Sequence, residues 1–222
     1  MSMKRGHSFL YGIFFLLLAA PVGLPECFPD EPPDPVEFVG DVLFGGNFTD
    51  VAVVGGAIYA TNEYGLLTFS LTDPETGEEV GLTEVSRVPT PGNANALSIS
   101  EALYAYVADG TDGLRVIDMG SNFLPPREIG SLESLDQALG VTHRRGVVFL
   151  AEGEAGLSIV DASTPENPVR IGRLDTEGSS EDVAVSGDVA YVADGIGGLW
   201  IVDIDSLAEP REISRYLPGG IV

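Results

Sequence analysis

The chain has 222 residues and a formal net charge of −23, because 34 aspartates and glutamates face only 11 lysines and arginines. This charge excludes nucleic acid as a partner, since a phosphate backbone binds to a basic face. Hydrophobic residues make up 44% of the chain and fall in short clusters among 28 glycines and 15 prolines, which is typical of a turn-rich β protein rather than a disordered chain.

The first 27 residues predict an export segment. Lys4 and Arg5 precede the apolar run Phe9–Gly23, which has the length and flanks of a signal peptide. The run is shorter than the roughly 20 apolar residues of a spanning helix, but no A-x-A site precedes Pro21, so an uncleaved anchor is the alternative. We expect a secreted, periplasmic or outer-surface protein that contacts a membrane only through this segment.

The single cysteine, Cys27, follows this run directly. Its position resembles the lipid acceptor of a bacterial lipoprotein, whereas Pro25 and Glu26 depart from the small residues that usually precede such a cysteine. Lipidation and cleavage without lipidation are therefore both open. An unpaired cysteine forms no internal disulfide, so the fold holds without one. Residues 28–35 form a linker rich in proline and acidic residues.

Residues 36–222 contain an internal repeat. A glycine followed by leucine recurs at spacings of 48, 43 and 42 residues, at Gly65, Gly113, Gly156 and Gly198. Periods of 20 to 50 residues are typical of stacked or radially arranged units, and about 40 to 45 residues is the length of a propeller blade. The repeats lie near residues 48–88, 95–132, 138–174 and 181–216.

Each repeat predicts four short strands. The last copy shows them most clearly as DVAVS, VAYVAD, GLWIVDI and PREISRYL, separated by turns rich in glycine, aspartate and serine. Three successive hairpins give a four-stranded antiparallel meander. The predicted fold is therefore all-β, a β-propeller of four four-stranded blades.

The third strands also carry a family resemblance. The segments GLRVID, GLSIVD and GLWIVD, each preceded by a YVADG-like strand, resemble the LVIVD repeat of bacterial and archaeal surface proteins. The first copy departs from the pattern with Thr68, Phe69 and Ser70. The resemblance implies a propeller and export, and it leaves the biochemical role open.

The ring of blades is predicted to be incomplete. Val39–Val42 resembles an additional outer strand ahead of the first blade, while the chain runs through a full fourth blade before LPGGIV. We expect either a truncated sequence or a ring completed by another chain. An open array exposes blade faces, so self-association is predicted.

Four residues are candidates for ligand contact. His143 stands where other repeats have Val53, Ile99 and Val185, and it is either a ligand-binding group or a partly buried histidine at a hairpin tip. Arg144 and Arg145 form a basic pair that either receives an anionic group or is solvated in a turn. Trp200 is either a surface aromatic or packed against the next blade.

Acidic residues recur at two strand ends. Asp109, Glu152 and Asp194 end the second strands and are expected to cap the Gly-rich turn that follows. Asp118, Asp161 and Asp203 end the third strands and are expected to cap the next turns. The alternative is cation ligation, but calcium needs 6 to 8 converging oxygens, whereas these residues are spread over different blades.

The expected function is a non-catalytic binding or scaffolding module for a protein or glycan at the cell surface, without a cofactor. P-loop, HExxH, G-x-S-x-G and Cys-His motifs are absent from the sequence. One alternative is a propeller-based hydrolase or lyase with paired carboxylates. The other is an acidic calcium-binding structural protein; the acidity also fits solubility or adaptation to salt.

Overall fold

The computed structural model describes residues 47–72, 77, 79–120 and 125–217. These residues contain sixteen strands and one short 3₁₀ turn, Gly195–Gly197. The predictions for the export segment, Cys27, the linker and the strand Val39–Val42 lie outside the described residues.

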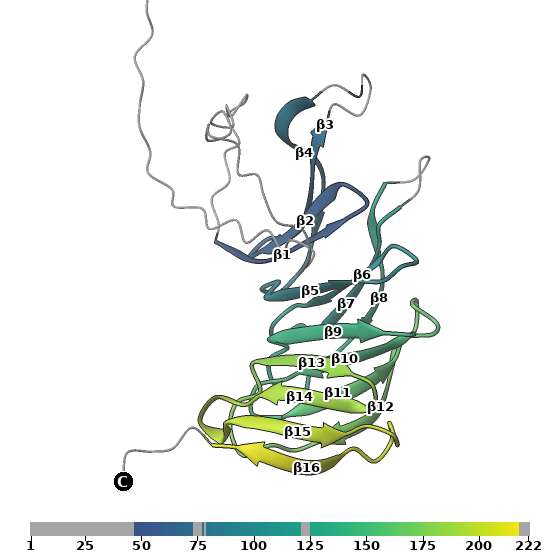
Figure 1. The fold of residues 1–222 in the computed structure, drawn as a ribbon. Helices are drawn as coiled ribbons and strands as arrows, with labels where there is room; N and C mark the ends of the chain where they lie inside the picture. The colour runs from purple at the N-terminus through teal and green to yellow at the C-terminus, as the bar shows by residue number, and fades with distance from the viewer. Residues whose placement is uncertain (1–46, 73–76, 78, 121–124, 218–222) are drawn as a thin grey trace, which may run out of the picture. The chain divides into compact units, whose positions relative to one another are not determined.

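The strands form four four-stranded antiparallel sheets, each with its strands in chain order (Figure 1). The first blade contains β1 (Phe48–Val54), β2 (Ala57–Asn62), β3 (Gly65–Thr72) and β4 (Glu79–Pro89). The second contains β5 (Ala96–Ile99), β6 (Tyr104–Ala108), β7 (Leu114–Asp118) and β8 (Arg127–Leu132). The third contains β9 (Gly140–Arg144), β10 (Val147–Ala151), β11 (Leu157–Asp161) and β12 (Val169–Leu174). The fourth contains β13 (Asp182–Ser186), β14 (Val189–Ala193), β15 (Leu199–Asp203) and β16 (Arg211–Tyr216).

This topology confirms the predicted all-β fold of four repeated four-stranded blades. The first strands of successive blades are neighbours: β1 lies beside β5, β5 beside β9 and β9 beside β13. Among the described strands, no strand of the first blade pairs with one of the fourth.

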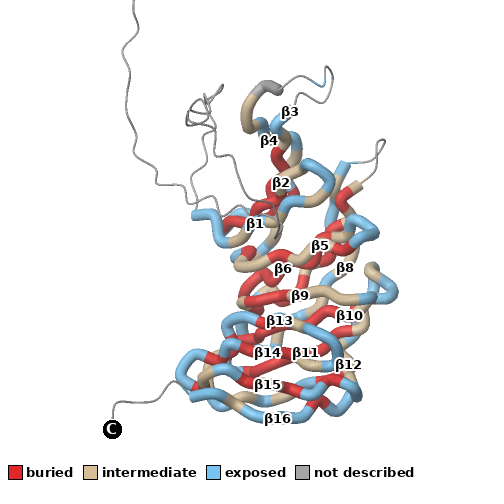
Figure 2. The backbone as a smooth tube through the Cα atoms, viewed as in Figure 1, coloured by how far each residue is buried: buried red, intermediate tan, exposed pale blue. Residues whose placement is uncertain are grey.

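The core lies between consecutive blades. In the central strands of the third blade, alternate side chains pack in opposite directions: Val148 and Leu150 against the second blade, Phe149 and Leu157 against the fourth. Both faces of these strands are covered, so their residues are nearly all buried, whereas the outer strand β16 is mostly exposed (Figure 2). This arrangement explains the nearly continuous apolar sequence of the second and third strands.

The repeated glycine before leucine has a steric cause. Gly113, Gly156 and Gly198 adopt φ of 80°, 81° and 82°, a left-handed conformation that side chains disfavour. A Cβ at each position would also overlap a carbonyl oxygen of the outer strand, that of Leu174 in the case of Gly156. The Gly-Leu signature of the sequence therefore marks a point where the start of the third strand closely approaches the end of the fourth.

Replacing Gly156 by alanine is expected to lower the free energy of unfolding by roughly 3 kcal/mol, because backbone strain and steric overlap add. The matched control is Gly187→Ala, whose φ is 60° but whose Cβ would meet open space. We expect that control to cost about 1 kcal/mol. Urea unfolding followed by circular dichroism measures both; equal losses would show that the close approach has no energetic role.

Candidate functional site

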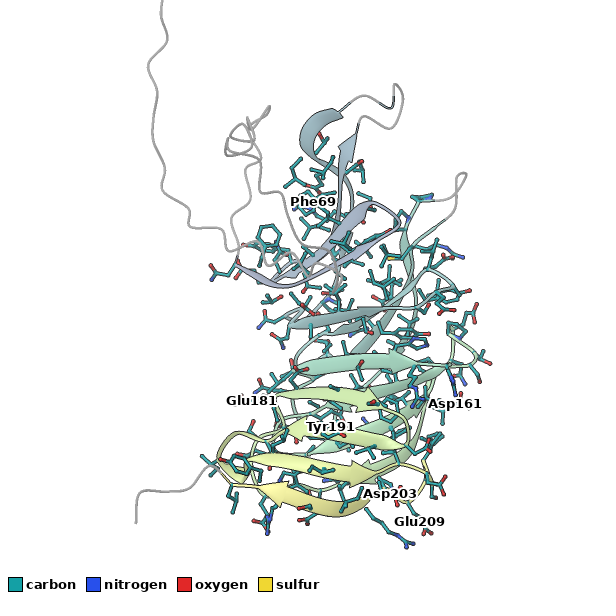
Figure 3. All side chains as sticks on the ribbon, viewed as in Figure 1. Phe69, Asp161, Glu181, Tyr191, Asp203 and Glu209 are labelled. Carbon is teal, nitrogen blue, oxygen red and sulfur yellow. The ribbon has the colours of Figure 1, made fainter. Side chains whose placement is uncertain are left out.

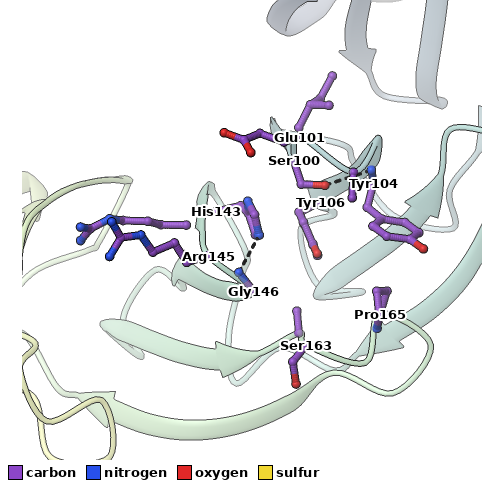
Figure 4. Close-up of a pocket in the computed structure, with 13 residues that line it drawn as sticks. Ser100, Glu101, Tyr104, Tyr106, His143, Arg145, Gly146, Ser163 and Pro165 are labelled. Atoms are coloured by element: carbon purple, nitrogen blue, oxygen red, sulfur yellow. Dashed lines mark hydrogen bonds between the residues drawn. The ribbon is translucent and has the colours of Figure 1, made fainter.

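An open pocket of about 620 Å³ lies between the second and third blades. Three segments build it: the turn between β5 and β6, the turn between β9 and β10, and the connection from β11 to β12 (Figure 4). Its polar lining comprises Ser100, Glu101, Tyr104, Tyr106, His143, Arg144, Arg145 and Ser163. The structure thus brings His143, Arg144 and Arg145 to one site, as their adjacency in sequence requires, and adds partners from the second blade.

His143 stacks on a tyrosine of the neighbouring blade. The ring centroids of His143 and Tyr106 are 4.7 Å apart and the rings are inclined by 11°. The backbone N–H of Gly146 donates to His143 Nε2 at 3.1 Å, so in the neutral ring the proton resides on Nδ1. Burial lowers the pKa of His143, and the negative charge of Glu101 opposes this shift. The histidine is therefore a neutral, fixed part of the pocket wall near pH 7.

Arg145 occupies a strained backbone position at the pocket rim. Its φ is 52°, in the left-handed region, where the equivalent turn positions of the first and fourth blades carry Gly55 and Gly187. An L-residue other than glycine pays about 1 kcal/mol or more for this conformation. Leu103, in the opposite turn of the same pocket, is the only other residue of this kind in the described part of the chain. Both strained residues therefore flank the pocket.

The two arginines have different surroundings. Arg144 points to the fourth blade, where its guanidinium donates to the carbonyl oxygen of Gly187. Arg145 is exposed, and among the described residues no hydrogen bond or ion pair engages its side chain. Figure 4 shows the ring of His143 between Arg145 and Tyr106. Arg144 therefore links the third and fourth blades through this hydrogen bond, while the guanidinium of Arg145 is available to bind a ligand.

Buried carboxylates connect each of the last three blades to its predecessor. Asp109, Glu152 and Asp194 are fully buried. Asp109 accepts hydrogen bonds from Thr90 Oγ1 at 2.6 Å and Gly92 N at 2.9 Å, both in the connection that leads from the first blade to the second. Asp194 accepts equivalent bonds from Thr176 Oγ1 at 2.6 Å and Gly178 N at 2.8 Å.

Glu152 performs the same role with a longer side chain. It accepts hydrogen bonds from Ser134 Oγ at 2.8 Å and from Leu135 N at 3.2 Å, in the connection from the second to the third blade. Arg170 lies 3.0 Å from the carboxylate and compensates its charge. The hydroxyl of Ser158 donates to the second oxygen. Burial of a charged group is costly without such partners, and each of these three carboxylates has them.

The prediction that Asp109, Glu152 and Asp194 cap the following turn is therefore wrong for their side chains. That turn closes through the backbone, as in the bond from Asp109 N to Gly113 O at 2.7 Å. The carboxylates point instead to the preceding connection. The partners Thr90 and Thr176 were missed, although the sequence carries a signal for them: Thr-x-Gly recurs 86 residues apart, ahead of each aspartate by 19 and 18 residues.

The third-strand aspartates cap the turns that follow them. Asp118, Asp161 and Asp203 accept from the backbone N–H two residues onward, at 2.9, 2.9 and 3.0 Å. Figure 3 shows Asp161 and Asp203 on different blades. Bonds from Ser163 lower the pKa of Asp161. Within the described part of the chain, no group of three or more histidine, cysteine, aspartate or glutamate residues has an arrangement that would hold a metal ion.

Trp200 is interior rather than a surface aromatic. It is 4% exposed and packs in the cluster between the third and fourth blades, with the guanidinium of Arg215 5.2 Å from its ring centroid. It does not line the pocket. The interpretation as a surface contact is wrong, and the side chain packs against the preceding blade rather than the next one.

The fold and the interblade packing define a β-propeller-type repeat protein. The LVIVD repeat model matches residues 91–133, 146–176 and 177–217, which is just over half of the chain. The chain belongs to the LVIVD-repeat family. The match covers most of the second, third and fourth blades, and the first blade has the same topology with a divergent sequence.

Similar solved structures support the same fold. The chain aligns with the WD40 repeats of RRP9 at a TM-score of 0.58 and 13% identity, over 76% of this chain and 51% of that one. The computationally designed Ika4 protein gives 0.58 and 11%, covering 76% of this chain and 98% of that one. Apo AztD from Citrobacter koseri aligns at a TM-score of 0.50 and 16% identity, over 78% of this chain and 48% of that one. The chain thus spans about half the length of two of these three, and no curated protein matches it.

The described residues include no helix with the length and apolarity needed to cross a membrane.

Replacing Asp194 by alanine is expected to lower the free energy of unfolding by roughly 2 to 4 kcal/mol, because buried donors of Thr176, Gly178 and Ser180 lose their acceptor. The control is Asp203→Ala, which removes a turn-capping carboxylate at an exposed position and should cost about 1 kcal/mol or less. Thermal and urea denaturation compare the two. Similar losses would mean that the buried carboxylate does not hold the blades together.

The stability of the chain is expected to fall as the pH drops below about 6.5, the ordinary pKa of histidine. The folded state disfavours the proton on His143 and the unfolded state does not, so protonation favours unfolding. The only other histidine is His7, in the predicted export segment. His143→Gln should flatten the melting temperature between about pH 5 and pH 7. If the melting temperature of this variant falls with pH as steeply as that of the wild type, other groups cause the pH dependence.

Proposed function

We propose that this chain is an exported, non-catalytic binding module that holds an anionic group of its ligand in the pocket between the second and third blades. The repeated propeller-blade fold supports a binding or scaffolding module. The observation that carries the proposal is Arg145: an exposed arginine in a left-handed position where equivalent turns carry glycine. Strain of this kind persists where the side chain serves a function.

The electrostatics of the site favour a carboxylate-bearing ligand. The guanidinium of Arg145 presents several N–H donors in a plane that matches a carboxylate. Arg144 adds a second positive charge at the same turn, on a chain whose net charge is −23. Because the surrounding protein repels anions, recognition depends on this local pair, and a compact ligand with one acidic group fits better than a polyanion.

The remaining lining suits the uncharged part of such a ligand. The stacked rings of His143 and Tyr106 form an aromatic wall, and hydroxyl groups of Ser100 and Ser163 stand near it (Figure 4). Sugars and peptides both pair apolar contacts with hydroxyl hydrogen bonds. A non-catalytic role is supported because Glu101 is the only carboxylate in the described lining, whereas the hydrolase alternative needs two.

Export rests on the basic and apolar N-terminal residues and on the LVIVD repeat, which resembles that of surface proteins. We therefore expect the ligand of the pocket to be an extracellular group carried on a glycan or on a protein.

The test uses Arg145→Gly, which is expected to weaken binding of an acidic ligand at least tenfold while keeping or raising the stability of the chain, since glycine relieves the strained turn. The probes are galacturonate and the capped dipeptide acetyl-Gly-Glu-amide, which carry one carboxylate each, with neutral galactose as reference, measured by calorimetry at about 0.15 M salt. The two acidic probes distinguish a glycan from a peptide source.

Arg211→Ala is the control, because it removes one exposed positive charge outside the pocket. It should leave binding unchanged. Equal affinity of wild type and Arg145→Gly for all probes, or an equal loss in Arg211→Ala, would overturn the pocket as the binding site.

A further inference from the structure

The pocket between the second and third blades contains a second free charge, of the opposite sign to Arg145. Glu101 lines the pocket from the turn between β5 and β6. Its side chain is exposed, and within the described part of the chain no hydrogen bond or ion pair engages it. Figure 4 shows Glu101 and Arg145 on two different turns around the ring of His143. The pocket therefore offers one free carboxylate and one free guanidinium, which do not pair with each other.

Glu101 and Arg145 occupy equivalent positions in adjacent blades. Each is the first residue of the turn that joins the first and second strands of its blade. The last residue of each turn accepts a hydrogen bond from the backbone N–H that follows the third strand. These bonds run from Met119 N to Leu103 O at 3.0 Å and from Ala162 N to Gly146 O at 2.8 Å. Because β5 lies beside β9, opposite charges stand at the same end of two neighbouring strands.

Both turns are held in place by the fold. In the turn of Glu101, Ser100 N donates to Tyr104 O at 2.9 Å and Tyr104 N donates to Ser100 Oγ at 3.1 Å. Leu103 in this turn and Arg145 in the other have a left-handed backbone, which an L-residue adopts only at a cost. Backbone strain is concentrated at functional sites, and here it falls in the two turns that carry the free charges.

Glu101 disfavours a ligand that carries only a negative charge. Burial lowers the pKa of His143 and the charge of Glu101 opposes this shift, so the carboxylate is close enough to act on the pocket wall. A simple anion bound by Arg145 would be repelled by Glu101 and by a chain with a net charge of −23. An ammonium group on the same ligand would turn the first repulsion into an attraction, and a net charge of zero would remove the second.

We propose that the ligand of this pocket is a zwitterion, whose carboxylate binds to Arg145 and whose ammonium group binds to Glu101. The inference rests on the proposed function, because it assigns a second charged group to the ligand of the same pocket. Neighbouring sheets pack about 10 Å apart, a distance that a unit of the size of a dipeptide or one amino sugar acid spans. Glu101 is then the residue that selects such a ligand over a plain carboxylate.

Two pairs of probes test the proposal by calorimetry at about pH 7, where an α-amino group is mostly protonated. The peptide pair is Gly-Glu-amide and acetyl-Gly-Glu-amide, and the sugar pair is galactosaminuronate and galacturonate. In each pair only the first member carries an ammonium group. The wild type should bind that member about fivefold more tightly in at least one pair, which corresponds to an exposed ion pair of about 1 kcal/mol. The pair that shows the preference identifies a peptide or a glycan as the source of the ligand.

Glu101→Gln should abolish the preference and leave the affinity for the two probes without an ammonium group unchanged or higher. The matched control is Glu154→Gln, which removes the same charge from an exposed turn beyond the other end of β10. The five residues of this strand span roughly 17 Å, about twice the screening length at 0.15 M salt. The control should keep the preference. Arg145→Gly should weaken binding of both members of each pair.

The outcomes separate this inference from the proposed function. Equal binding of both members in both pairs, a preference that persists in Glu101→Gln, or an equal loss in Glu101→Gln and Glu154→Gln would overturn the zwitterion and leave Arg145 as an anion site. If none of the four probes binds to the wild type, or if Arg145→Gly binds them as the wild type does, the proposed function and this inference both fail.

Discussion

The architecture depends on one buried interaction that is repeated in three blades: a carboxylate at the end of the second strand binds the connection that arrives from the preceding blade. Asp109, Glu152 and Asp194 accept hydrogen bonds from hydroxyl and backbone N–H groups of that connection. A buried carboxylate has no alternative partner in the core, so its bonds fix where each blade starts. Burial raises the pKa of Asp109, and bonds from Thr90 and Gly92 oppose this shift. The apolar clusters between blades can pack in only one register once these bonds are made.

The pocket follows from the same geometry. The connection into the third blade sets β9 beside β5, and the backbone N–H of His143 donates to Ser98 Oγ at 3.0 Å. The histidine thereby reaches Tyr106 in the neighbouring blade, and the following turn places Arg145 at the rim. The site is thus held by contacts between two neighbouring blades, which favours a preformed binding surface.

The sequence predicted the fold well because strand alternation, turn residues and a fixed period are local signals. The strands of the last repeat agree with β13 to β16 within a residue or two. Only part of the pocket could be predicted from the sequence. His143 and Arg145 are close in the chain, whereas Tyr106 and Ser100 join them through packing between blades. The role of Asp109 was misjudged because its partner Thr90 lies 19 residues earlier, in the connection that arrives from the first blade. Trp200 was ambiguous because a variable strand position does not say which face it occupies.

The buried carboxylates also bear on how such a chain grows. Thr90 and Asp109, like Thr176 and Asp194, lie within one stretch that begins at the connection and ends with the blade, and the family repeats beginning at residues 91 and 177 start within one residue of these threonines. A gene duplication with its breakpoints at the two threonines would copy each connection together with the acid that anchors it. Each inserted blade would then carry both members of the hydrogen bond that attaches it to the connection before it.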